Sequence, residues 1–326
     1  MSTTQEGSKK GTRKKIIHTL GNILMILALV FIVRRLWIYR ESITETVNAA
    51  VIAVIIVSVF LFGGLVLIQA HAYRILAGAV CGVEIPHGTA VRLYVKSNLY
   101  KYLPGNVFHF VGRNQIAEEC SLSHADIAFA TVLEIIIQCF AAVLTGLVLS
   151  FGFVTDYLTD FLRGRELLLI FLIAALCALV FAAVLILRKK FSARWERVRG
   201  LISGKGRRDV LRVILLHVMI QLCNGTLFLV LLQSMGGVVP AKMCGSVIGI
   251  YCFAWLVGFV TPGAPGGLGI REAMLSLFLG SLADPGLIAA AVLLNRIVTV
   301  FGDLAAYVFS LILIGKGTHA PKDADL

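Results

Sequence analysis

Long apolar runs recur along this sequence, and they limit its fold more than any other feature. A helix needs about 20 mostly apolar residues to cross the hydrocarbon core of a membrane. Six runs approach or exceed that length, at residues 16–33, 47–70, 125–150, 166–187, 210–235 and 286–314. They predict an all-α integral membrane protein with about six crossing helices, formed by a single polytopic domain over residues 1–326.

The composition excludes several large classes of protein. Of the residues, 58% are hydrophobic and 15% are charged, whereas a soluble domain carries about 25% charged residues. An ordinary cytosolic enzyme, a nucleic-acid-binding domain and a disordered chain are therefore not expected. The net charge of +12 lies in short clusters beside the apolar runs, as in membrane proteins whose basic loops set their orientation. The seven cysteines form no C-x-x-C pair, and we interpret them as small core residues.

Two further apolar regions, at about 88–123 and 243–283, are interrupted by proline and glycine. Pro104-Gly105 breaks the first region and Pro262-Gly263 breaks the second. Because proline removes a backbone donor and glycine permits a turn, each break should end one helical arm of about 12–16 residues and start another. Irregular backbone at membrane depth needs surrounding protein or a water-filled cavity. We therefore predict two re-entrant hairpins, with an amphipathic interfacial helix and a loop as the open alternative.

The two broken regions resemble each other. Pro104 and Arg113 have the same spacing as Pro262 and Arg271. A glycine–tyrosine pair of matching spacing also precedes each break: Gly88 with Tyr94, and Gly245 with Tyr251. These matches predict an internal repeat, with one copy at about 16–151 and the other at about 166–314. Each copy would hold three crossings, an odd number, so the second copy would be inverted, as in many transporters.

The distribution of basic residues predicts the orientation. With the N-terminus in the cytoplasm, the inside segments hold 22 Lys and Arg residues and the outside segments hold 7. Basic residues favour the cytoplasmic side. We therefore expect the tails 1–15 and 315–326 in the cytoplasm and segment 236–242 on the outside.

Arg113 and Arg271 are the first candidates for ligand binding. Each follows the proline of its break at the same distance, in an apolar region where a guanidinium needs a cavity or a partner. Its planar fork of donors matches a phosphate, which is the group that a lipid head group offers. The open alternative is a structural arginine that bonds backbone carbonyls at a helix end.

Three more charged residues lie within apolar runs: Glu134, Arg296 and Asp303. Buried charges are usually paired. Glu134 and Arg296 are a plausible pair, because their helices are equivalent in the two copies of the repeat. The alternative is that Glu134 or Asp303 is a protonatable group that couples transport to protons.

No catalytic or metal-binding pattern is visible. The glycine-rich stretch 263–269 is not followed by Gly-Lys-Ser/Thr, so it does not match a nucleotide phosphate loop. His71, His87 and His109 are scattered, and we interpret them as interfacial. We expect no enzyme activity, no cofactor and no metal.

At the two breaks the sequence resembles a known family. Tyr102-Leu103-Pro104-Gly105 with Gly112-Arg113, and Pro265-Gly266-Gly267-Leu268-Gly269-Ile270-Arg271-Glu272, resemble the signature stretches of the lysylphosphatidylglycerol synthase transmembrane-region family, also described as the flippase-like domain family. The resemblance covers roughly residues 15–315. It implies a bacterial inner-membrane protein related to the flippase half of the multiple peptide resistance factor. There, a cytoplasmic aminoacyltransferase domain makes an aminoacyl lipid and the membrane domain moves it outward.

The resemblance also implies site residues. Arg113, Arg271 and Glu272 stand at motif positions, and the adjoining substrate-binding candidates are Lys101, Pro104, Gly105, Pro262, Gly263, Gly266 and Gly267. The sequence ends at Leu326, shortly after the last predicted helix. A transferase domain and synthase activity are therefore not expected.

Two functions stay open. The leading hypothesis is a transporter that translocates an anionic phospholipid or a polyprenyl-phosphate-type precursor between leaflets, with the head group in a cavity and the acyl chains in lipid. The sequence shows no ATP site, so movement would run downhill or be coupled to protons. The alternative is a non-transporting scaffold that presents lipid to a separate glycosyltransferase or lipid-modifying enzyme.

Overall fold

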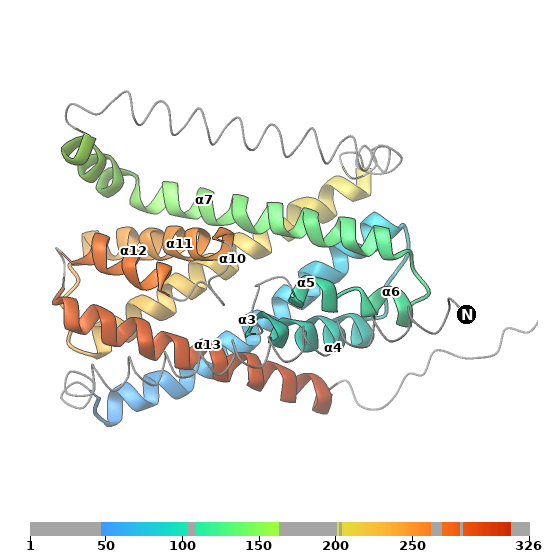
Figure 1. Cartoon of the computed structure of the whole chain (residues 1–326), viewed down its shortest axis with the longest axis horizontal. Coiled ribbons are helices and arrows are strands. Elements are labelled where there is room, and N and C mark those ends of the chain that lie inside the picture. The colour runs from blue at the N-terminus through green and yellow to red at the C-terminus, as the bar shows by residue number, and fades with distance from the viewer. Residues whose placement is uncertain are drawn as a thin grey trace, which may run out of the picture.

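The described part of the chain is helical throughout its regular secondary structure. The computed structural model describes residues 47–102, 108–162, 201, 204–261, 269–280 and 283–313. Four long helices dominate the molecule: α3 (Ala49–Cys81), α7 (His124–Leu162), α10 (Gly204–Ser234) and α13 (Pro285–Leu313). Figure 1 shows α7 and α13 running near its longest axis and α3 and α10 crossing it obliquely. The expected helices at 16–33 and 166–187, both tails, and Pro104, Gly105, Pro262, Gly263, Gly266 and Gly267 lie outside the described residues.

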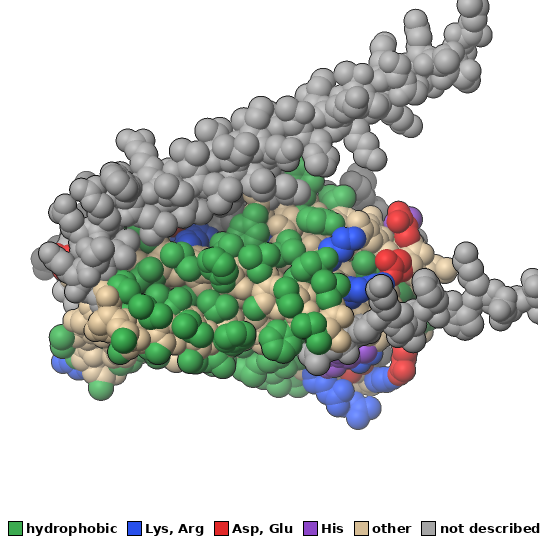
Figure 2. Space-filling view, turned by 90° about the horizontal axis from the view of Figure 1, so that it is seen from below, with side chains coloured by type: hydrophobic (Ala, Val, Ile, Leu, Met, Phe, Trp, Pro, Cys, Tyr) green, Lys and Arg blue, Asp and Glu red, His purple; other side chains and the backbone are tan. Residues whose placement is uncertain are grey.

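The helices have the length and surface of a membrane-embedded protein. Among the described residues, five helical stretches are long and apolar enough to cross a membrane: Ala49–Cys81, His124–Gly152, Gly204–Ser234, Ala241–Val260 and Gly286–Ile312. Large apolar side chains are exposed along α3 and α13, among them Phe60, Phe301 and Ile312. Figure 2 shows this broad apolar face, with charged side chains gathered toward one end. The protein is therefore a multi-pass membrane protein.

Two long helices extend beyond their predicted ends. We expected a crossing over 47–70, but α3 begins after Asn48, whose side chain accepts from two backbone N–H groups, and continues to Cys81. It continues because Tyr73 and Leu76 are buried against protein, so polarity beyond residue 70 does not end the helix. The helix α7 passes its expected end at Ser150, where the backbone is locally non-helical and the hydroxyl donates to Gly146 O at 2.6 Å.

Short helices occupy both broken regions, on either side of each Pro-Gly sequence. The first region contains α4 (His87–Asn98), the 3₁₀ turn η1 (Leu99–Tyr102), α5 (Phe108–Gly112) and α6 (Gln115–Glu119). The second contains η3 (Ala241–Met243), α11 (Cys244–Val260) and α12 (Ile270–Leu279). The two sets lie toward opposite ends of the molecule (Figure 1). With 17 residues, α11 is slightly longer than the predicted arm; whether these regions are re-entrant hairpins stays a prediction.

The two larger hydrophobic cores follow the order of the predicted repeat, and a small third core of Ala72, Leu76, Ile137 and Val213 joins α3 and α7 to α10. One larger core unites α3, α4, α6 and α7, and the other unites α10, α11, α12 and α13. Each larger core also receives residues from the other half: Val51 of α3 lies in the second core, and Leu201 and Ala306 lie in the first. The two halves therefore interlock through α3 and α13, while the inverted repeat itself stays a prediction.

Candidate functional site

Arg113 is buried in a box of aromatic rings. Its guanidinium carbon lies 5.1 Å from the ring centroid of Tyr73, 4.2 Å from that of Tyr94 and 5.3 Å from that of Phe110. The preceding residue explains the placement, because a Cβ at Gly112 would lie 2.6 Å from the ring of Tyr100. Only a glycine lets the end of α5 approach η1 this closely, and the chain then turns Arg113 inward, where its side chain is 2% exposed.

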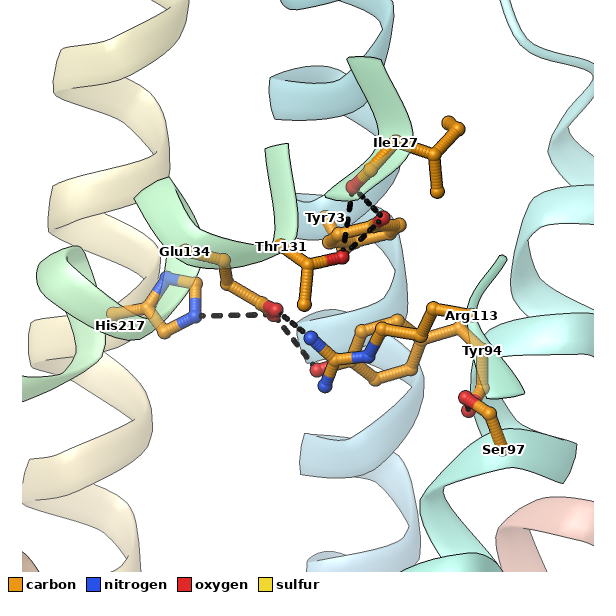
Figure 3. Close-up of polar contacts among 8 residues, drawn as sticks. All are labelled: Tyr73, Tyr94, Ser97, Arg113, Ile127, Thr131, Glu134 and His217. Atoms are coloured by element: carbon orange, nitrogen blue, oxygen red, sulfur yellow. Dashed lines mark hydrogen bonds and ion pairs between the residues drawn. The ribbon is translucent and has the colours of Figure 1, made fainter. Parts of the chain in front are cut away.

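Arg113 forms an ion pair with Glu134 of α7, which is fully buried (Figure 3). The hydroxyl of Tyr94 donates to Glu134 Oε1 at 2.8 Å, and Nε2 of His217 lies 3.8 Å from the same oxygen. The predicted pair of Glu134 with Arg296 is therefore wrong. α5 and α7 bring Arg113 and Glu134 together within the first half, so the carboxylate already has a buried cation beside it.

A second cluster of charges joins the first broken region to the last helix. Asp303 of α13 is 1% exposed, and Lys101 Nζ lies 2.6 Å from its Oδ2. Asn98 donates to Oδ1 of the same carboxylate at 2.8 Å, and the Tyr102 hydroxyl donates to Oδ2. Lys101, a substrate-binding candidate, is thus held by Asp303, and three donors from α4 and η1 satisfy this carboxylate.

The motif residues Glu272 and Arg271 differ in their charged partners. Glu272 lies 3.5 Å from Arg296 Nε, an ion pair between α12 and α13. Arg271 lies 5.9 Å from the ring centroid of Trp255, and its Nε has no hydrogen-bond partner in the described part of the protein. No ion pair joins Arg271 to a carboxylate among these residues. The two motif arginines, equally spaced in the sequence, therefore differ in how their charge is met.

A cavity of about 110 Å³ connects these groups. Side chains from α3, α4, α5, α7, α10, α11, α12 and α13 line it, so it lies between the two halves. It has room for a few water molecules or one small ionic group. The site residues Lys101, Arg113, Arg271 and Arg296 all lie on its wall.

The charges around this cavity do not cancel. Asp303 neutralises Lys101, Glu134 neutralises Arg113, and Glu272 neutralises Arg296. Within the described residues, this leaves the charge of Arg271 in excess. The wall also carries buried polar atoms without a hydrogen-bond partner in that part of the chain: His109 Nδ1, Arg113 Nε, His217 Nε2, Gln221 Oε1, Asn224 Oδ1 and Arg271 Nε. Buried polar atoms normally have partners, so the cavity suits a polar, anionic ligand.

Sequence reasoning missed several residues of this site. His109 was expected at the interface, but it is 5% exposed and lines the cavity. His217, Gln221 and Asn224 were not singled out, although all three line the cavity from α10. Their spacing was the available signal, because polar residues four and three apart in an apolar run share one face of a helix.

The comparisons with known proteins bear on the family of this chain. No curated protein matches the chain. The model of one family, described as "Lysylphosphatidylglycerol synthase TM region", matches residues 19–306. That match spans both broken regions and every charged residue of the cavity wall. The chain belongs to the lysylphosphatidylglycerol synthase transmembrane-region family, whose members are membrane domains related to lipid synthesis and flippase-like function.

Proposed function

We propose that this protein translocates an anionic lipid between membrane leaflets, with the phosphate of the head group in the cavity between its two halves. The observation that carries the proposal is that Arg113 and Arg271, from two broken regions far apart in sequence, line one cavity with one positive charge in excess. A phosphate would offset that charge and accept charge-assisted hydrogen bonds. The substrate class is a phospholipid or a polyprenyl-phosphate-type precursor.

The two arginines would contribute unequally to this binding. Arg271 forms no ion pair with a carboxylate in the described part of the chain, and its Nε lacks a hydrogen-bond partner there, so it has a donor available to a phosphate. Arg113 already pairs with Glu134, so it would contribute mainly by shaping the wall and through its unpaired Nε. Arg271 is therefore the principal phosphate ligand of the proposal.

The size of the cavity supports binding of a head group and not of a whole lipid. About 110 Å³ holds a small ionic group, whereas the exposed apolar surfaces of α3 and α13 suit acyl chains. A charge in hydrocarbon costs several kcal/mol. A polar cavity at membrane depth would lower this cost while the chains stay in lipid.

We further propose that the chain moves its lipid without altering it. The protein would lie in the bacterial cytoplasmic membrane with both tails in the cytoplasm, as the basic residues predict. A separate lipid-modifying enzyme or glycosyltransferase would then supply or consume the lipid.

Replacing Arg271 with lysine tests the phosphate ligand. The variant keeps the charge but loses the planar two-donor fork, and a charge-assisted hydrogen bond contributes roughly 1.5–3 kcal/mol. We expect transport of labelled phosphatidylglycerol in proteoliposomes to fall about tenfold or more, with thermal stability unchanged. Arg92→Lys is the matched control, because Arg92 pairs with Glu119 on the surface, and it should transport normally.

A panel of head groups in the same assay identifies the substrate class. Wild-type protein that leaves every labelled lipid in its original leaflet would contradict translocation and favour the scaffold alternative. Normal transport by Arg271→Lys would contradict the proposal that Arg271 is the phosphate ligand.

A further inference from the structure

The position of His217 determines which of its ring nitrogens can exchange a proton. Nδ1 lies 2.8 Å from the carbonyl oxygen of Val213, one turn earlier in α10. A carbonyl oxygen only accepts hydrogen bonds, so Nδ1 must carry a hydrogen and donate it. The remaining nitrogen, Nε2, is therefore the atom that gains or loses a proton.

Nε2 faces a carboxylate, and His217 is one of the residues that line the cavity. Nε2 lies 3.8 Å from Glu134 Oε1 and has no hydrogen-bond partner in the described part of the protein (Figure 3). In the neutral ring, a lone pair of Nε2 points toward a negatively charged oxygen, which is unfavourable. A proton on Nε2 converts this contact into an ion pair. His217 can therefore bind one added proton at Nε2, next to Glu134.

The surrounding charges decide when that proton is held. The titratable and charged side chains around this corner and across the cavity, with the carboxylates that pair with them, are Tyr73, Tyr94, Lys101, Tyr102, His109, Arg113, Glu134, Tyr251, Arg271, Glu272, Arg296 and Asp303. Their unbalanced charge is that of Arg271, which opposes a second positive charge in the same cavity. An anionic head group removes this opposition, because opposite charges attract strongly in a site of low dielectric.

We infer that His217 and Glu134 form a proton-binding site that couples the proposed lipid movement to protons. The inference rests on the proposed function and identifies a proton gradient as the driving force of the lipid movement. One proton from water binds Nε2 as one anionic head group enters the cavity, and the same proton leaves Nε2 to water on the other side as the head group leaves. Only an N–H bond forms and breaks, and the protein returns to its starting state.

This coupling has a quantitative consequence. A head group with one negative charge and one proton moves without net charge, so a membrane potential alone should not drive it. A gradient of one pH unit corresponds to about 1.4 kcal/mol and shifts the distribution of lipid between leaflets about tenfold at equilibrium. Because the linkage is reciprocal, the lipid and the proton should each promote binding of the other.

The experiment uses the full-length protein in phosphatidylcholine vesicles with a trace of labelled phosphatidylglycerol. The fraction of label in each leaflet is measured at equal pH and with one pH unit across the membrane, in both directions. We expect wild-type protein to enrich the label up to about tenfold in the leaflet on the less acidic side. A pH dye trapped in the vesicles should record proton movement with the lipid in the wild-type protein itself.

Two histidine variants locate the site. In His217→Gln the amide can still donate to Glu134 but does not titrate, so lipid should equilibrate between leaflets without regard to the pH gradient. His124→Gln is the control, since His124 is exposed at the start of α7 and does not line the cavity, and it should keep the response.

The outcomes separate this inference from the proposed function. Lipid that equilibrates between leaflets equally with and without a gradient in the wild-type protein would overturn proton coupling and leave translocation intact. A gradient response that persists in His217→Gln, or disappears in His124→Gln, would overturn the assignment to His217. The absence of any lipid movement in wild type would instead overturn the proposed function.

Discussion

At the residue scale, the two motif arginines have different surroundings. Arg113 is enclosed by aromatic rings and paired with Glu134, whereas Arg271 lies near the ring of Trp255 and forms no ion pair with a carboxylate among the described residues. The tyrosines of the predicted repeat show the same difference. Tyr94 donates to Glu134, while Tyr251 accepts from Asn295 on α13. The tyrosine of the first half thus meets a carboxylate, whereas that of the second half meets a neutral amide.

Removal of Arg113 should destabilise the protein strongly. Arg113→Ala leaves the carboxylate of Glu134 buried and uncompensated, and breaking a buried pair from one side costs about 3–5 kcal/mol. Arg92→Ala is the control, because the partly exposed pair with Glu119 contributes at most about 1 kcal/mol. Thermal unfolding in detergent measures both. The double variant Arg113→Ala/Glu134→Ala should recover part of the lost stability. If Arg113→Ala destabilises the protein no more than Arg92→Ala does, a structural role for the Arg113–Glu134 pair is contradicted.

The sequence identified the buried charges but not their partners. Arg113, Glu134, Arg296 and Asp303 are all buried, as their positions in apolar runs predicted. The choice of partner depends on the direction in which α5 presents Arg113 after Gly112, and sequence spacing does not contain that direction. The predicted pair of Glu134 and Arg296 failed for this reason. The family and the cavity arginines were predicted because their motifs are local in sequence.

At the scale of elements, glycines bring α3 and α13 into close contact. A Cβ at Gly302 would lie 2.6 Å from Cδ1 of Phe62 and 3.0 Å from the carbonyl oxygen of Val59. A Cβ at Gly63 would in turn lie 3.1 Å from the carbonyl oxygen of Gly302. Small residues let helices approach closely in membranes, where apolar burial drives association less than in water. The contact joins the two halves at the helices that extend into each other's core.

Gly302→Ala should therefore destabilise the protein, because the new methyl group must push α3 away from α13. Overpacking of this kind costs about 1–3 kcal/mol. Gly64→Ala is the matched control: a Cβ there meets nothing within 4 Å, and alanine favours a helix over glycine by about 1 kcal/mol. It should leave stability unchanged or slightly increased. Thermal unfolding decides, and a stable Gly302→Ala protein would show that the helices can separate without cost.

At the scale of the whole molecule, the two ends of the helix bundle differ in their elements. α4, α5 and α6 lie toward one end, and α11 and α12 lie toward the other (Figure 1). α10 connects the two ends, beginning near Lys205 and Arg207 and ending before the exposed Val238. If its basic end lies in the cytoplasm, the first broken region enters from the cytoplasmic side and the second from outside. The cavity between them would then be reachable from opposite sides of the membrane.

Cysteine labelling tests this orientation. The side chain of Val238 is 84% exposed. In a variant whose natural cysteines have been replaced, Val238→Cys should therefore react with a membrane-impermeant maleimide in spheroplasts. Lys205→Cys, at the other end of α10, should react only in inside-out vesicles. The two sites serve as each other's control, because α10 is long and apolar enough to separate them by a membrane. Reversed labelling would place the second broken region on the cytoplasmic side and contradict the orientation predicted from the basic residues. Labelling of both sites from one side would mean that α10 does not cross, and the opposed entry of the two regions into one cavity would fail with it.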